Sequence, residues 1–256
     1  MALWLLAMAR CAFGGVGIST PTTAVVFPSG PAVPENLLRV ELRFSAPLRI
    51  PFSMDHVKLI GSGGREIEHA FLDLPLPSAD GRRVTILMDP GRVKSGLMEN
   101  RILGRALHVG STVTLIVDDP QLSAPVRKTW WVTSFDAEVP RPARWTLDLP
   151  VLGTRDALVI HLHAPLSSTA ESFIAVRGPD ELRVSGVGRL ERGETLWRFT
   201  PRQPWKPGAY ALVTHPDLED PAGNRPCGLF EAVAASRVQC EGTVRVFRAT
   251  EAKEKS

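Results

Sequence analysis

Apolar and charged residues alternate most regularly in residues 38–44. Every second position is apolar and the positions between carry charge, the two sets being Leu38, Val40, Leu42 and Phe44 against Arg39, Glu41 and Arg43. A period of two gives a strand one apolar and one charged face. We therefore predict a half-buried antiparallel strand at this place.

Short apolar runs recur along the first half, separated by clusters of Gly, Pro, Asp and Asn. They predict further strands at residues 24–27, 57–60, 83–88, 112–117 and 129–134. Runs of this length at this spacing are typical of a β-sandwich. The interval 89–110 is longer, and residues 97–107 within it predict a short helical turn.

The same order of landmarks appears twice in the chain. Residues 42–48 (LRFSAPL) return as residues 160–166 (IHLHAPL), and the segment 110–115 returns as 208–212 with a slip of one residue. Trp197 and Phe199 likewise match Ile86 and Met88, in each case before a proline. A repeat of this length predicts two similar β domains in tandem, and therefore an all-β protein.

These observations divide the chain into five parts. We expect a leader segment at 1–21, a first domain at 22–135, a linker at 136–144, a second domain at 145–250 and a charged tail at 251–256. Each half is long enough to bury its own core. Pro140 and Pro142 stiffen the linker, because each proline restricts the residue before it to extended geometry.

Three motifs together resemble the bacterial Ig-like domains of the surface-layer type. They are FSAPL at 44–48, GAYALV at 208–213 and DPAGN at 220–224. The resemblance covers roughly residues 36–248 and extends to exported bacterial proteins with two such domains. It implies two Ig-like β-sandwich domains in tandem outside the cytoplasm, with no catalytic residues. The first copy departs from the pattern, because its DDP at 118–120 is not followed by Gly-Asn.

Composition and the first residues bear on partners and location. Apolar residues make up 44% of the chain, and 30 Lys and Arg stand against 27 Asp and Glu without a basic run. We therefore expect a folded protein that does not bind nucleic acid. Residues 1–9 (MALWLLAMA) are too short to span a bilayer but suit a signal peptide, which predicts a periplasmic or extracellular protein. Arg10 argues against lipid anchoring at Cys11.

Two further cysteines, Cys227 and Cys240, lie near the C-terminus. In an oxidising compartment they would close a short disulfide loop, and two buried thiols are the alternative. Both readings stay open on the sequence. No Cys and His spacing indicates a zinc site.

Two groups of residues are weak candidates for metal binding. His161 and His163 share one strand face, which permits two ligands to one transition metal. Oxygen donors that would suit calcium crowd one loop at Asp217, Glu219, Asp220 and Asn224. The simpler interpretation is two solvated histidines and a structural turn in which Gly223 takes a positive φ. We expect no cofactor.

Aromatic residues near the linker suggest an interface. Trp130 and Trp131 are adjacent on a predicted strand, so one side chain faces inward and the other outward. Trp145 follows the linker, which predicts an interdomain contact with the outward Trp, and stacking on a sugar is the alternative use of that side chain. Tyr210 begins a late strand, where a sandwich uses a tyrosine hydroxyl to tie a loop to the backbone.

No catalytic motif is present. The chain has no GxSxG nucleophile elbow, and GSGG at 61–64 lacks the Lys-Ser/Thr of a phosphate-binding loop, so a hairpin turn is expected there. We expect a noncatalytic exported protein that serves as a structural or protein-interaction module of the cell envelope. Its partner would be a protein or an envelope polymer. The alternative is a carbohydrate-binding or accessory module of an exported enzyme system.

Overall fold

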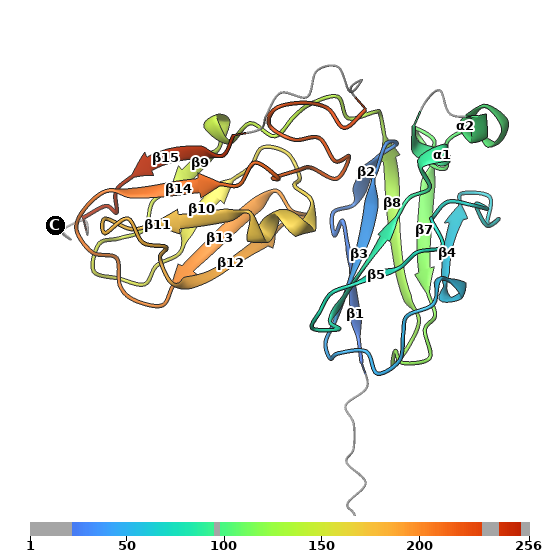
Figure 1. Cartoon of the computed structure of the whole chain (residues 1–256), viewed down its shortest axis with the longest axis horizontal. Coiled ribbons are helices and arrows are strands. Elements are labelled where there is room, and N and C mark those ends of the chain that lie inside the picture. The colour runs from blue at the N-terminus through green and yellow to red at the C-terminus, as the bar shows by residue number, and fades with distance from the viewer. Residues whose placement is uncertain (1–21, 95–97, 232–240, 252–256) are drawn as a thin grey trace, which may run out of the picture.

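A computed structural model describes residues 22–94, 98–231 and 241–251. The expected leader with Cys11, the cysteine Cys240 and residues 252–256 of the tail lie outside the described residues. The described chain forms two β-sandwiches joined by a single linker (Figure 1). Among the described residues, no hydrogen-bonded sheet is shared between the two halves. None of the described helices is long and apolar enough to cross a membrane.

The first sandwich packs two four-stranded sheets face to face. One sheet has the order β1-β3-β6-β5 and the other the order β2-β8-β7-β4. Their bounds are β1 Ala24–Phe27, β2 Ala32–Pro34, β3 Arg39–Phe44, β4 Val57–Gly61, β5 Leu76–Pro77, β6 Arg83–Leu87, β7 Thr112–Val117 and β8 Val126–Thr133. The pairs are antiparallel except β2 with β8, which run parallel.

Short helical turns connect the strands of this domain. They are η1 Met54–His56, α1 Pro90–Val93 and α2 Met98–Leu103. Asp89 caps α1 by accepting the N–H of Gly91 at 2.7 Å, and Pro90 takes the first helical position, where its missing N–H costs nothing. Helix α2 lies within the segment for which the sequence predicts a helical turn.

The second sandwich pairs a four-stranded sheet, β12-β13-β10-β9, with a three-stranded sheet, β11-β14-β15. The bounds are η2 Pro142–Arg144, β9 Thr146–Asp148, β10 Leu158–His161, η3 Ser168–Ser172, β11 Ile174–Arg177, β12 Gly186–Glu191, β13 Leu196–Pro201, β14 Tyr210–Thr214 and β15 Thr243–Phe247. All pairs between these strands are antiparallel.

Strand order makes both sandwiches Ig-like. With the short strand β2 left out of the count, each domain has seven described strands. The first, second, fourth and fifth share one sheet, and the third, sixth and seventh share the other. The repeated motifs occupy equivalent strands: residues 42–44 end β3 and residues 160–161 end β10, the second strand of the Ig-like order in each domain. The prediction of two tandem Ig-like sandwiches is therefore confirmed.

Each sandwich has its own core. Leu42, Ile86 and Leu115 are fully buried between the sheets of the first domain, and Leu158 and Ile160 between those of the second. These residues take the inward positions of alternating strands, which is why the apolar pattern predicts the strands well. Two separate cores also explain why the repeat appears in the sequence as two complete sets.

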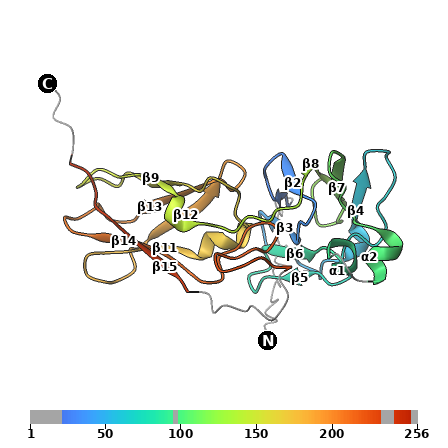
Figure 2. The same cartoon turned by 90° about the horizontal axis from the view of Figure 1, so that it is seen from above.

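The two sandwiches lie transverse to one another. In Figure 1 the strands of the first domain run vertically and those of the second run close to horizontal. Figure 2, seen from above, shows loops at one end of the second sandwich facing the first domain on the side of β3. The charged face of β3 is therefore placed against the neighbouring domain, and the contacts there define the candidate site.

Candidate functional site: the junction between the sandwiches

The charged face of β3 is covered by the second domain. Glu41 is only 3% exposed although it is charged, and Arg39 and Arg43 on the same face are each about three-quarters buried. A charge leaves water only where a partner replaces its hydration. The other domain supplies those partners for both arginines.

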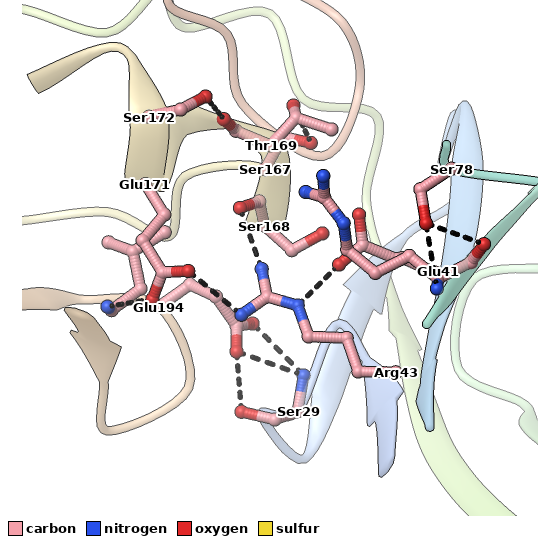
Figure 3. A network of polar contacts seen from close by, with 12 residues as sticks. Ser29, Glu41, Arg43, Ser78, Ser167, Ser168, Thr169, Glu171, Ser172 and Glu194 are labelled. Carbon is pink, nitrogen blue, oxygen red and sulfur yellow. Dashed lines mark hydrogen bonds and ion pairs between the residues drawn. The ribbon is translucent and has the colours of Figure 1, made fainter. Parts of the chain in front are cut away.

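Arg43 is the centre of the junction (Figure 3). Its Nε contacts Glu41 Oε1 at 2.5 Å, its Nη1 donates to Glu171 Oε2 at 2.9 Å, and its Nη2 donates to the Ser168 carbonyl at 3.0 Å. The guanidinium carbon also lies 4.3 Å from the centre of the Phe27 ring. The planar guanidinium thus joins one acid of its own strand to two groups on η3, a geometry that a lysine does not reproduce.

A second ion pair lies beside the first. Arg39 Nη2 is 2.7 Å from Glu219 Oε1, and the Thr169 hydroxyl is 3.4 Å from the same oxygen. Burial raises the pKa of Glu219, and the charge of Arg39 opposes that rise. Glu219 was a weak calcium candidate from the sequence, but in the structure its carboxylate faces an arginine of the first domain.

Glu194 makes the third charged contact. Its side chain is 1% exposed and accepts from Ser29 three times: from the backbone N–H at 3.0 and 3.2 Å and from the hydroxyl at 2.5 Å. Lys128 donates from Nζ to the Ser29 carbonyl at 2.5 Å, which brings a positive charge near the carboxylate. Burial still raises the pKa of Glu194 above its ordinary value.

Backbones touch beside Glu194. A Cβ placed on Gly193 would lie 2.9 Å from the Gly30 Cα, and Gly193 has φ +64°. The close approach requires glycine at this position, and the left-handed conformation favours it. The turn between β12 and β13 therefore fits directly against the loop between β1 and β2.

One asparagine from each domain binds the linker. Asn36 donates from Nδ2 to the Asp136 carbonyl at 3.1 Å and accepts the Asp136 N–H at 2.9 Å. Asn224 donates to the same carbonyl and to that of Glu138, both at 3.1 Å. The linker is thus held by side chains from both sandwiches, in addition to the stiffness that its prolines provide.

The loop at residues 217–224 is a structural turn, as predicted. Asp220 Oδ1 accepts the N–H groups of Ala222 and Asn224 at 2.9 Å, and Gly223 has φ +78°. The Pro221 carbonyl accepts the Leu38 N–H at 2.9 Å, so this turn also reaches the first domain. Burial, opposed by the hydrogen bonds of the turn and reinforced by the nearby Asp136, raises the pKa of Asp220 to about 7.

The other metal candidates have separate partners. His161 Nε2 lies 2.9 Å from Asp148 Oδ2, whereas His163 Nε2 lies 2.5 Å from the Arg144 carbonyl. Asp217 pairs with Arg225, whose Nη1 is 2.7 Å away. In the part of the chain that the structure describes, no three His, Cys, Asp or Glu side chains converge as metal ligands would.

The tryptophans take three different environments. Trp130 is 1% exposed in the first domain, where its Nε1–H donates to the Pro28 carbonyl at 2.9 Å. Trp131, on the opposite face of β8, is 50% exposed. Trp145 packs in the core of the second domain. The interdomain contacts of the described residues run through β3 and its neighbours, and none of them joins Trp131 to Trp145.

Two other sequence predictions concern Tyr210 and the cysteines. The Tyr210 hydroxyl accepts the Lys206 N–H at 2.8 Å and donates to the Lys206 carbonyl at 3.1 Å, which confirms its structural role. Cys227 is held in a disulfide. Its expected partner, Cys240, lies outside the described residues.

Sequence reasoning missed the residues that form the junction. Arg39, Glu41 and Arg43 belong to the alternating strand, but alternation alone does not show what covers the charged face. Nothing in the sequence marks Glu194 as an interface residue, because it lies in a turn, where a charged side chain is normally exposed to water. The three charges on one face of the alternating strand are the signal in the sequence from which an interface could have been predicted.

Comparisons with known proteins find similar solved structures but no similar sequence. No protein-family model matches the chain, and no curated protein is similar to it in sequence. Among solved structures, a titin Ig tandem matches with a TM-score of 0.26 and 9% identity, over 84% of this chain and 87% of that chain. Rst D1-D2 matches with a TM-score of 0.25 and 6% identity, over 91% and 100%.

A third solved structure is a chimeric titin functionalised with an exogenous peptide from decorin. It matches with a TM-score of 0.24 and 12% identity, over 75% of this chain and 88% of that chain. Because these TM-scores are low, the Ig-like assignment rests on the strand order of the two sandwiches.

Proposed function

We propose that this chain is a noncatalytic, exported module of the bacterial cell envelope that holds two Ig-like sandwiches in a fixed transverse orientation and presents their surfaces to a protein or envelope polymer. The observation that carries the proposal is the Arg43 contact with Glu171 and Ser168. A simple spacer would need only a linker, whereas here buried charges of one domain fit partners of the other.

The junction is costly to separate. Removing one partner of a buried ion pair leaves an uncompensated charge and typically costs about 3–5 kcal/mol. Arg39 and Arg43 each keep about a quarter of their side chains exposed, so we expect less than this for each pair and an effect of a few kcal/mol for the network. A junction of this kind favours one orientation of the domains over the range that a stiff linker allows.

Three features support the envelope location. Residues 1–9 are apolar enough for a signal peptide, and three motifs resemble surface-layer Ig-like domains. Cys227 is disulfide-bonded, and disulfides persist mainly in oxidising compartments. Expression of the full chain in a bacterium, followed by fractionation, is expected to place the protein outside the cytoplasm, with residues near the start removed.

Charge reversal at the junction tests the proposed rigidity. Arg43→Glu places three carboxylates together, so we expect a broader distribution of interdomain distances in small-angle scattering while both cores stay folded. A second change, Glu171→Arg, is expected to restore much of the wild-type shape by reversing the pair. Arg127→Glu is the matched control, because Arg127 is exposed on the outer sheet of the first domain. An unchanged distance distribution in Arg43→Glu contradicts the proposal.

The carbohydrate-binding alternative has one observation in its favour. Trp131 is half exposed on β8, where an indole face lies open to stack on a sugar ring. If this alternative holds, Trp131→Ala abolishes binding of the full chain to envelope polysaccharide and leaves its scattering profile unchanged. Equal binding by the variant and the wild type removes the support for it.

A further inference from the structure

A groove of about 490 Å³ opens along one side of the second sandwich. Its walls come from β11 and β12, which are the edge strands of the two sheets. Gly186 and Gly188 of β12 line it, together with Trp197, Phe199 and Arg183. Its volume lies in the range of sites that bind ligands.

The edge of β12 in this groove has free backbone groups. The Ser185 carbonyl accepts the Arg202 N–H at 2.8 Å, so odd-numbered residues of this strand turn toward β13. Because backbone groups alternate along an antiparallel strand, Gly186, Gly188 and Leu190 turn theirs to the open edge. Among the described residues, no hydrogen bond outside the pairing with β13 uses the backbone of the two glycines.

The third residue of that edge shows how the free groups are satisfied. The Leu190 N–H donates to Glu171 Oε1 at 3.0 Å, so η3 covers this end of the strand. The Arg177–Arg183 bridge closes the other end. The open stretch between them is short and matches an extended segment of a few residues.

The rings of Phe199 and Trp197 occupy the space where side chains at Gly186 and Gly188 would lie. A Cβ on Gly186 would lie 2.4 Å from the Phe199 ring, and one on Gly188 would lie 2.7 Å from the Trp197 ring. The two rings stack with centres 5.6 Å apart. β12 therefore lacks side chains where the rings lie, and the floor of the groove is aromatic.

One buried donor at this floor has no acceptor within the described part of the chain. Trp197 is 1% exposed, and its Nε1–H has no hydrogen-bond partner among the described residues. The same atom lies 3.0 Å from the Cβ position of Gly188, which places it beneath the open edge. A buried polar group without a partner is uncommon and marks a place where an acceptor from outside would fit.

The charge at the groove is positive. Arg183 forms no ion pair among the described residues. Arg189 lies 3.8 Å from Glu171, whose carboxylate pairs more closely with Arg43, at 2.9 Å. Glu171, the acid that lines the groove, is thus committed to the junction and to the Leu190 N–H. An incoming segment with acidic side chains is the one that complements these arginines.

We propose that the free edge of β12 and its groove bind an extended segment of a partner protein, in which apolar and acidic residues alternate, as an added strand of the sheet. Backbone hydrogen bonds to Gly186 and Gly188 provide the pairing, and apolar side chains enter the groove. The proposal rests on the proposed role as an interaction module. Its test measures binding at β12 of the second domain, a surface that the Arg43→Glu change at the junction does not alter.

The probe is an acetylated and amidated hexapeptide of alternating valine and glutamate, added to the isotope-labelled full chain. We expect saturable shifts of the Gly186 and Gly188 amide signals and slower hydrogen exchange at both amides. A matched peptide with lysine in place of glutamate is expected to bind at least fivefold more weakly. The scattering profile stays unchanged, which separates this result from a failure of the junction.

Variants test the charge and the location. Arg183→Glu is expected to weaken the glutamate peptide about fivefold and to strengthen the lysine peptide, as for an exposed ion pair. Arg248→Glu, an exposed change beside β15, is the control and leaves both peptides unchanged. The proposal is overturned if the glutamate peptide causes no saturable shift, or if Arg183→Glu leaves the affinities of both peptides at their wild-type values. It is also overturned if an oligosaccharide, and not the peptide, shifts the signals of Gly186 and Gly188.

Discussion

Single side chains at the junction differ in what they contribute. Arg43 needs a planar fork to reach Glu41, Glu171 and the Ser168 carbonyl at once, whereas Asp220 needs only one oxygen to hold its own turn. The carboxyl of Asp220 is buried beside Asp136, and burial of two acids together disfavours the charged form. The protonation of Asp220 therefore changes near neutral pH.

The pH dependence of stability provides a test of Asp220. Its folded pKa of about 7 lies above the ordinary value of 3.8, so its contribution is full at low pH and is lost as pH rises through 7. We expect the free energy of unfolding to fall between pH 5 and pH 9, by on the order of 3 kcal/mol at most, with most of the fall complete by pH 7. Asp220→Asn keeps a neutral acceptor and is expected to flatten this dependence in urea unfolding.

Asp217→Asn is the matched control for that prediction. Asp217 belongs to the same loop but is about half exposed and paired with Arg225. We expect its variant to retain the fall in stability between pH 5 and pH 9. Identical pH profiles for the wild type and Asp220→Asn would show that the buried carboxyl does not titrate in this range.

Turns and strand edges decide how the elements meet. The turn between β12 and β13 touches the β1–β2 loop through Gly193 and Gly30, while the open edge of β12 lies farther along the same strand. One strand thus takes part in the junction at one end and in the proposed peptide site at the other. This arrangement puts the bound partner at a defined place relative to the first domain.

Gly193→Ala tests the contact between the turns. The change adds a Cβ 2.9 Å from the Gly30 Cα and forces a left-handed alanine, so both strain and a clash are expected. Gly153→Ala is the control, because Gly153 also has a positive φ but open space around it. We expect each change to cost about 1 kcal/mol from the positive φ alone and only Gly193→Ala to broaden the interdomain distances. Equal scattering profiles would contradict a tight contact.

The whole molecule combines two independent cores with one specific junction. Hydrophobic residues of the two domains form separate clusters, and the contacts between domains are mainly polar. Polar interfaces of this kind orient domains without being required for their folding. Stability of each sandwich and rigidity of the pair are therefore separable properties.

Expression of the two halves checks that separation. Residues 22–135 and 145–250 are each expected to unfold in one cooperative transition, because each contains a complete pair of sheets and its own core. A first half that remains unfolded alone, while the full chain folds, would indicate a fused core.

Local pattern determined much of this protein. Alternation placed β3, and turn residues at 220–224 predicted a structural turn, because both depend on neighbours within a few positions. The repeat predicted two sandwiches, since each strand set is complete within its own half. The positive φ of Gly223 and the hydroxyl role of Tyr210 were equally readable from short segments.

Tertiary structure alone decided which surfaces meet. Arg43 and Glu171 are separated by 128 positions, and Ser29 and Glu194 by 165, so no local period relates them. Alternation shows that β3 has a charged face, but only the placement of the second domain shows that this face is covered. The free edge of β12 likewise appears only when the strand order of the sheet is known, because an edge is defined by the neighbour that is missing.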